Sequence, residues 1–383
     1  MKTNILVRMT LVVSLGLGIL LPVRADEPLV LDIQPRLVGI DIGIGYRGIT
    51  MLPGLQTTFW GYIGMGYENE HYYRDSAGNL LSSGEIGPHG AQPNADPNVN
   101  RIEDAWRAGI DQGILWNPRT HTNLLEAFGF YIGRYDLNKP ASDSLLAVVP
   151  ISILPDRDEL FLNSVQLGLG YDDLLPDKKH KTKDGISAEV SAEWGPGFLF
   201  NSIMGSSDFL RFNGNFRWFH RVYDADPDST LNSLSVYFGE YFSADYAVGL
   251  NGTRVPLAIR QSFGGRDQNV GLGDSVRGVD KGAYDTNLKA VNNIELRVNL
   301  PALWFQDLVP GLLVYFDTGF YDQVGEPGIS SPSPGLVATT GVGAYIDVFD
   351  LGYILMYVEY RLDAPNAAGE RFRPFVFEFG LRF

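Results

Sequence analysis

The chain ends in a pattern that strongly restricts its fold. Every second residue from position 375 onward is large and apolar, and the last residue is a phenylalanine. Neighbouring side chains of a strand point to opposite faces, so these residues would form one apolar face: Phe375, Phe377, Phe379, Leu381 and Phe383. Such a final strand is typical of outer-membrane β-barrels, whose strands alternate between lipid and lumen. The alternative, a sandwich strand that ends in phenylalanine by chance, is disfavoured because the alternation recurs along the chain.

Thirteen segments show a strand pattern, and no stretch after the amino terminus has the roughly 18 consecutive apolar residues of a membrane-spanning helix. Bacterial single-chain barrels have an even number of strands. We therefore expect an all-β protein, a transmembrane antiparallel barrel of about 14 strands within a range of 12 to 16. The count is open at the first strand and at 145–154, which Pro150 and Pro155 interrupt. The thirteen segments are 37–47, 57–68, 105–115, 124–137, 160–171, 185–194, 209–223, 233–242, 292–300, 311–321, 337–349, 353–363 and 372–383.

The amino terminus has the features of a secretory signal. Its basic start and apolar run end at residue 21, too early to span a bilayer as a helix, and Val23-Arg24-Ala25 fits a small-x-small cleavage site. We expect a signal peptide at 1–25, a short periplasmic lead at 26–36 and a barrel at 37–383, in the cell outer membrane. A retained membrane anchor is the alternative.

Net charge and residue composition exclude several classes of protein and several kinds of site. The net charge is −15, and loss of residues 1–25, with three basic and no acidic residues, would leave −18, which argues against nucleic-acid binding. The absence of cysteine excludes a lipoprotein anchor and disulfides. The five histidines form no metal-binding pair, and no G-x-S-x-G motif is present. We expect no cofactor, no metal and no catalytic residues. The acidic run 224–228 and the basic run 178–183 are expected to be solvated turns.

One stretch, residues 263–300, organises the second half of the chain. It opens with a corner at Gly264-Gly265 and continues into a long loop that carries Val276-Arg277-Gly278. The strand after the loop carries Glu295, and the next strand carries Asp317 and Gly319.

These motifs and their spacing resemble the BamA/TamA/FhaC superfamily, also called the bacterial surface antigen family, over about residues 163–383. In that family a sixth extracellular loop carries Val-Arg-Gly and folds back into the barrel lumen. The resemblance implies the same path here, with Glu295 and Asp317 as the family's lumenal carboxylates. Two departures stand out: we expect no periplasmic POTRA domains in this chain, and Val279 replaces the usual aromatic residue.

Physical chemistry supports an ionic latch at this place. A guanidinium stays charged and offers five donors in a fixed fork, so Arg277 could bind Glu295 and Asp317 together. Both carboxylates fall on the lumen-facing phase of their strands. The alternative is that Arg277 lies in a solvated loop, where an ion pair contributes little.

The resemblance implies a non-enzymatic barrel that inserts or translocates protein or lipid through a seam between its first and last strands, regulated by the lumenal loop. A passive pore or a structural surface protein is the alternative, and an outer-membrane enzyme is disfavoured. The expected partners are outer-membrane lipids, the barrel-assembly machinery during biogenesis and, since POTRA domains are absent, a periplasmic partner protein.

Overall fold

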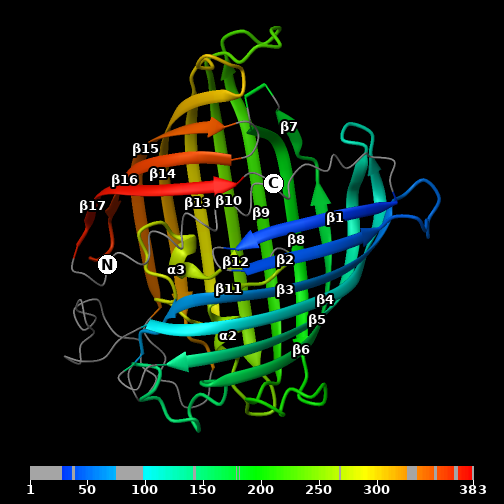
Figure 1. The fold of residues 1–383 in the computed structure, drawn as a ribbon, viewed down its shortest axis with the longest axis vertical. Helices are drawn as coiled ribbons and strands as arrows, with labels where there is room; N and C mark the ends of the chain where they lie inside the picture. Colours follow the sequence, from blue (N-terminus) through cyan, green and yellow to red (C-terminus); the bar gives the residue numbers. More distant parts are fainter. Residues whose placement is uncertain are drawn as a thin grey trace.

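A computed structural model shows one continuous antiparallel sheet that curves around a folded loop (Figure 1). The residues that the structure describes are 28–36, 39–74, 98–140, 144–177, 179–180, 182–266, 269–325, 334–348, 352–365 and 370–381.

Fourteen strands follow one another in a single path along the sheet, and each pairs with its neighbours in antiparallel register. This confirms the predicted fold class and the favoured strand number. A further short strand, β7 (Leu175–Asp177), pairs with β8 outside that path. The fourteen are β1 (Leu29–Arg36), β2 (Gly39–Tyr46), β3 (Thr57–His71), β4 (Asn98–Asn117), β5 (Thr122–Pro140), β6 (Glu159–Asp172), β8 (Thr182–Gly195), β9 (Phe209–Asp224), β10 (Ser235–Gly249), β13 (Leu288–Asn299), β14 (Leu308–Asp322), β15 (Gly335–Val348), β16 (Gly352–Arg361) and β17 (Phe372–Leu381).

The first strand corrects the expected boundary. The periplasmic lead predicted at 26–36 is wrong from Leu29 onward, because β1 pairs with β2 over its whole length. Pro35 obscured the strand pattern, but proline is tolerated in a strand at the end of a sheet, where one row of N–H groups has no ladder partner. The predicted signal peptide at 1–25 lies outside the described residues.

The two faces of the wall differ as the alternation requires. On β14, Leu312 and Val314 point outward with 52% and 51% exposure, whereas Tyr315 and Asp317 point inward and are buried. Phe375 and Phe377 of β17 are 80% and 70% exposed on the outer face. The structure does not describe the side chains of Phe379 and Leu381, and Phe383 lies outside its described range.

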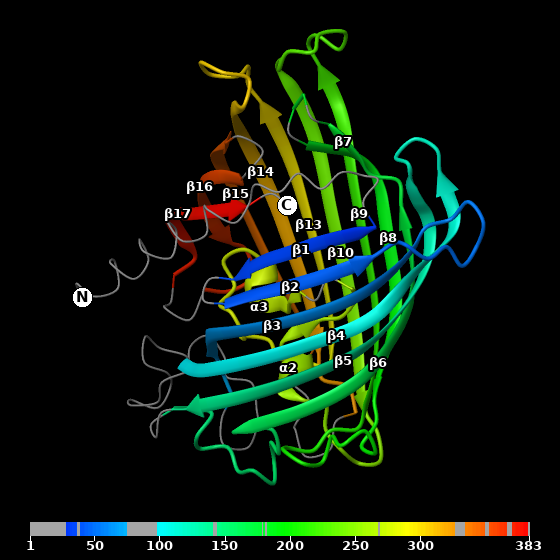
Figure 2. The ribbon, with the colours of Figure 1, turned by 45° about the vertical axis from the view of Figure 1, so that its right-hand side comes forward.

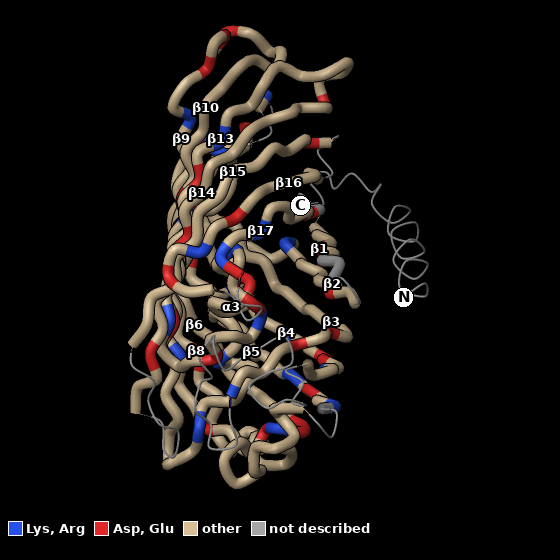
Figure 3. Tube along the Cα trace, turned by 90° about the vertical axis from the view of Figure 1, so that its left-hand side faces the viewer, with Lys and Arg blue, Asp and Glu red and all other residues tan. Residues whose placement is uncertain are grey.

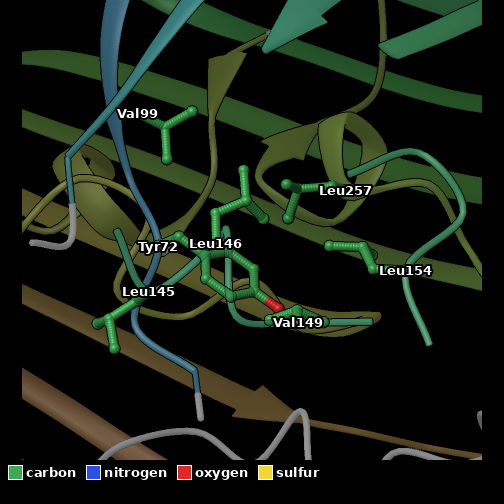
Figure 4. Packing of buried hydrophobic residues seen from close by; sticks show 7 residues of the cluster. All are labelled: Tyr72, Val99, Leu145, Leu146, Val149, Leu154 and Leu257. Atoms are coloured by element: carbon green, nitrogen blue, oxygen red, sulfur yellow. The ribbon is translucent and has the colours of Figure 1, made fainter. Parts of the chain in front are cut away.

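The apolar run at 145–154 forms a cap of turns. Leu145, Leu146, Val149 and Leu154 are buried together with Leu257 of the loop inside the barrel, as Figure 4 shows. The prolines end any strand pattern here, and the apolar side chains pack against the lumenal loop.

The loop between β10 and β13 folds back into the space that the wall encloses (Figures 1 and 2). It contains one helical turn, α2 (Leu257–Arg260), and a kinked four-residue turn, α3 (Leu272–Ser275), in which Gly273 and Asp274 have non-helical backbone angles. It also contains a small hairpin of β11 (Ser262–Phe263) and β12 (Asn269–Val270). In the described part of the chain, no helix has the length and apolar character needed to cross a bilayer.

The two ends of the sheet are β1 and β17, which face each other in Figures 1 and 3. Within the described residues, no hydrogen-bonded ladder joins them. We call this junction the seam.

Candidate functional site

Arg277 joins the lumenal loop to two neighbouring strands. Its Nε and Nη2 donate to Oδ2 and Oδ1 of Asp317 on β14, both at 2.7 Å, and its Nη1 donates to Oε1 of Glu295 on β13 at 2.6 Å. The backbone N–H of Arg277 also donates to Asp317 Oδ2 at 3.1 Å. The guanidinium lies 3.7 Å from the ring centre of Tyr315, a cation–π distance. The structure thus brings together the three charged residues of the expected latch.

These contacts fix the charge state of the arginine. Burial alone would lower the pKa of Arg277, but the hydrogen bonds and charges of Asp317 and Glu295 more than offset burial and raise that pKa above its ordinary value. Glu295 is shared, because its Oε2 accepts from Nε of Arg297 at 2.7 Å. The carboxylates therefore have cationic partners inside the barrel.

The two glycines of the motif allow this close approach. Gly278 has φ +78°, a left-handed conformation, and a Cβ there would lie 3.0 Å from the carboxylate of Glu359 on β16. At Gly319, a Cβ would lie 2.7 Å from Val337 and 2.8 Å from Leu272 of the loop. A side chain at position 319 would therefore push the loop away from the wall.

Apolar packing holds the same segment. Val276 is fully buried in a cluster with Phe263 and Leu272 of the loop and with Val291 of β13. Val279, which stands where the resembling family has an aromatic residue, is buried in this cluster too. The smaller side chain therefore occupies an apolar position.

A second arginine, which the sequence analysis missed, forms a clamp on the opposite part of the wall. Arg266 follows the Gly264-Gly265 corner and donates to Glu189 of β8 at 2.8 Å and to Glu126 of β5. Gly265 has φ +108°, and a Cβ there would lie 2.9 Å from Glu189. The corner thus lets the backbone approach the wall closely enough for Arg266 to reach both carboxylates.

The charge of Arg266 is held in the same way. Burial would lower its pKa, but Glu126 and Glu189 raise it above the ordinary value. In the sequence, a basic residue after a glycine corner is only weak evidence for such a clamp. Its partners lie 140 and 77 residues away, so they could not be chosen without the strand register.

The turn between β6 and β8 contains another polar cluster. His180 is fully buried, with Nδ1 at 3.1 Å from Asp177 and Nε2 at 3.4 Å from the hydroxyl of Ser233. The Ser233 hydroxyl donates instead to Asp224 at 2.6 Å, and Lys179 Nζ lies 3.0 Å from that carboxylate. Because the serine proton is directed away from the histidine, we interpret this cluster as an anchor for the turn. The sequence analysis had assigned Lys179 and Asp224 to solvated turns.

A cavity of about 250 Å³ lies between the loop and strands β2 to β5, lined by charged side chains that include Asp41, Glu68, Glu70, Arg101 and Lys281. Among the residues described, no group of three or more histidines and carboxylates has a metal-binding arrangement.

Comparisons with known proteins find similarity in structure alone. No protein-family model matches the sequence, and no curated protein matches it. Among solved structures, BamA from Haemophilus ducreyi lacking POTRA domains 1–3 aligns over 92% of this chain with a TM-score of 0.53 and 12% identity. CdiB from Escherichia coli aligns over 90% with a TM-score of 0.51 and 12% identity.

The chain spans 64% of the BamA structure and 52% of the CdiB structure. At these identities the likeness concerns the fold. The chain therefore shares its β-barrel fold with these BamA and CdiB structures, as the resemblance of its motifs led us to expect.

Proposed function

We propose that the chain is an outer-membrane barrel that inserts or translocates protein or lipid, and that its seam between β1 and β17 opens for this purpose. The main support is that the sheet has two end strands with no ladder between them in the described range, while a folded loop is fixed to the wall beside them. An end strand presents a row of unpaired N–H and C=O groups that an incoming strand can bind.

The lumenal loop is the second element of the proposal. Arg277 and Arg266 hold it at two separate parts of the wall, so the loop stays inside the barrel while the seam changes. The expected setting is the outer membrane, because an apolar outer face suits lipid contact. A periplasmic protein would present the client to the seam.

The test uses a chemical link across the seam. The chain has no cysteine, so Ile33→Cys on β1 and Phe377→Cys on β17 can be joined by a flexible bis-maleimide. The purified protein is reconstituted in liposomes, and the folding rate of an added unfolded eight-stranded barrel is followed by its gel mobility without heating. The matched control links Val342→Cys and Val358→Cys on the paired strands β15 and β16.

We expect the unlinked protein to accelerate client folding, the seam link to abolish the acceleration and the control link to leave it intact. An acceleration that survives the seam link would refute the proposed role of the seam. No acceleration with any variant would refute insertion of this client class.

A passive pore is the second candidate, favoured by the charged cavity beside the loop. A pore predicts single-channel conductance in planar bilayers that the seam link leaves unchanged. It also predicts that Arg266→Ala increases this conductance, because the loop would then obstruct the lumen less.

A further inference from the structure

The loop continues beyond the Arg277 latch and contacts both ends of the sheet. Asp280 pairs with Arg373 of β17 at 3.2 Å. The next residue, Lys281, pairs with Glu68 and Glu70 of β3 at 3.2 and 3.0 Å. Figure 3 shows basic and acidic positions gathered around α3, where the loop passes β17.

These two contacts lie on opposite sides of the seam. In the sheet order, β17 is one end, and β3 is the third strand from the other end. Asp280 and Lys281 are adjacent, with their Cα atoms about 3.8 Å apart, so the backbone between the two contacts has almost no slack. Separation of the two sheet ends would therefore break at least one of these ion pairs.

The backbone around Lys281 is fitted to β3. Gly282 has φ +74°, and a Cβ there would lie 2.2 Å from the carbonyl oxygen of His71 at the end of β3. The same oxygen accepts from Gln261 of the loop at 3.1 Å, and Gln261 accepts from Arg101 of β4 at 3.1 Å. The loop is thus seated against the first strands of the sheet by backbone and side-chain contacts.

Exposure separates the two kinds of contact. The Asp317 side chain is fully buried in the latch, whereas the side chains of Asp280, Arg373, Lys281 and Glu68 are 24%, 35%, 26% and 29% exposed. Glu70, the closer partner of Lys281, is only 7% exposed. Partly exposed ion pairs contribute little and weaken with salt, whereas loss of a buried partner has a large cost. The loop therefore combines firm anchors, Arg277 on Asp317 and Lys281 on the buried Glu70, with a weaker contact across the seam, the Asp280–Arg373 pair.

We propose that Asp280 and Lys281 form a releasable strap that holds β17 and β3 together across the seam, and that release of this strap is the step that lets the seam open. The role in opening rests on the proposed function, whereas the strap itself concerns the resting barrel and needs no client.

The test measures the width of the seam in the purified, refolded protein. Spin labels are attached at Leu31→Cys on β1 and Phe375→Cys on β17, whose native side chains are exposed on the outer face and belong to none of the strap pairs. Pulsed electron–electron double resonance then gives the distribution of distances between the two spin labels. In this background, Asp280→Asn/Lys281→Met removes all three ion pairs of the strap, and Asp280→Glu/Lys281→Arg keeps them.

We expect the neutral double variant to raise the ratio of long to short label distances about fivefold. This factor corresponds to the upper end of the free energy that a partly exposed ion pair contributes. The conservative double variant and Arg119→Ala, which removes an exposed ion pair with Asp173, should keep the parent distribution. An unchanged distribution in the neutral variant would overturn the strap, whatever the client assay gives.

A salt titration of the labelled parent protein tests the same contacts without any change to them. The long-distance fraction should rise between about 0.1 and 1 M NaCl, because screening weakens partly exposed pairs. A fraction that stays constant with salt would also overturn the proposal, and this holds even where the neutral variant fails to refold.

Discussion

Removal of the Arg277 side chain should destabilise the barrel strongly. Arg277→Ala deletes three charge-assisted hydrogen bonds and a cation–π contact, and it leaves the buried Asp317 carboxylate with the backbone N–H of residue 277 as the remaining partner from this latch. Loss of one partner of a buried ion pair typically costs about 3–5 kcal/mol. The Arg277 side chain is 16% exposed to the lumen, so we expect the lower end, about 3 kcal/mol.

The double mutant decides whether the two residues act as a unit. Asp317→Ala should cost about 2–3 kcal/mol, because Arg277 keeps Glu295 as a partner. If the latch is one unit, Arg277→Ala/Asp317→Ala should cost about 3 kcal/mol, which corresponds to a coupling energy of about 2–3 kcal/mol.

The assay is urea unfolding of protein refolded in phospholipid vesicles, followed by gel mobility without heating. Glu295→Gln is the matched control: Arg277 keeps its bonds to Asp317, so we expect a loss of about 1 kcal/mol. A double mutant that costs the sum of the single mutants would refute the coupling, and no effect in any variant would refute the latch.

Four further predictions use the same preparation. Gly278→Ala should lower the free energy of unfolding by more than Gly252→Ala: both glycines have φ +78°, which costs about 1–2 kcal/mol with a Cβ, but only position 278 also meets a neighbouring carboxylate. Arg266→Ala should cost about as much as the loss of the latch arginine, and the two losses should add in the combined variant, because Arg266 binds Glu126 and Glu189 whereas Arg277 binds Glu295 and Asp317. Burial raises the pKa of Asp156, so the folded state binds the proton more tightly; relative to Asp156→Asn, wild-type stability should therefore rise as the pH falls from 7 toward about 4 in urea titrations. Leu146→Ala removes a fully buried side chain from the cap, which should lose about 2–4 kcal/mol locally and speed proteolysis within residues 144–158, while the urea midpoint of the wall stays unchanged.

The wall was predictable because its signal repeats in every strand. A membrane barrel must place apolar residues outward at every second position, so sequence alone gives the faces, as Leu312 and Tyr315 illustrate. The favoured count of fourteen is correct, but the thirteen segments recognised directly omit β1, where the pattern is short: β1 has eight residues, and Pro35 lies within it. Pairing with β2, a long-range property, decides that Leu29–Arg36 is a strand.

Contacts inside the lumen could be predicted only where one sequence motif contains both partner residues. Arg277, Glu295 and Asp317 could be related because one spacing pattern contains all three. Arg266 lies in the same loop, but its partner Glu126 belongs to the distant strand β5, and only the register of the whole sheet brings the two together. The apolar residues of 145–154 were recognised, but the surface that buries them, Leu257 of the loop, could not be deduced.

The alternation that makes the wall predictable also explains why the loop depends on ion pairs. Each strand gives its apolar face to the lipid, so the enclosed space receives the polar face, and a loop within it finds few apolar surfaces to pack against. The chain supplies three apolar clusters that include loop residues. Ion pairs add contacts from the loop to several strands: Arg266 to β5 and β8, Arg277 to β13 and β14, Lys281 to β3 and Asp280 to β17. Ion pairs differ from apolar packing in that burial sets their strength over a wide range. The same loop can therefore be fixed at one buried carboxylate and released at partly exposed ones, which uniform apolar packing would not allow.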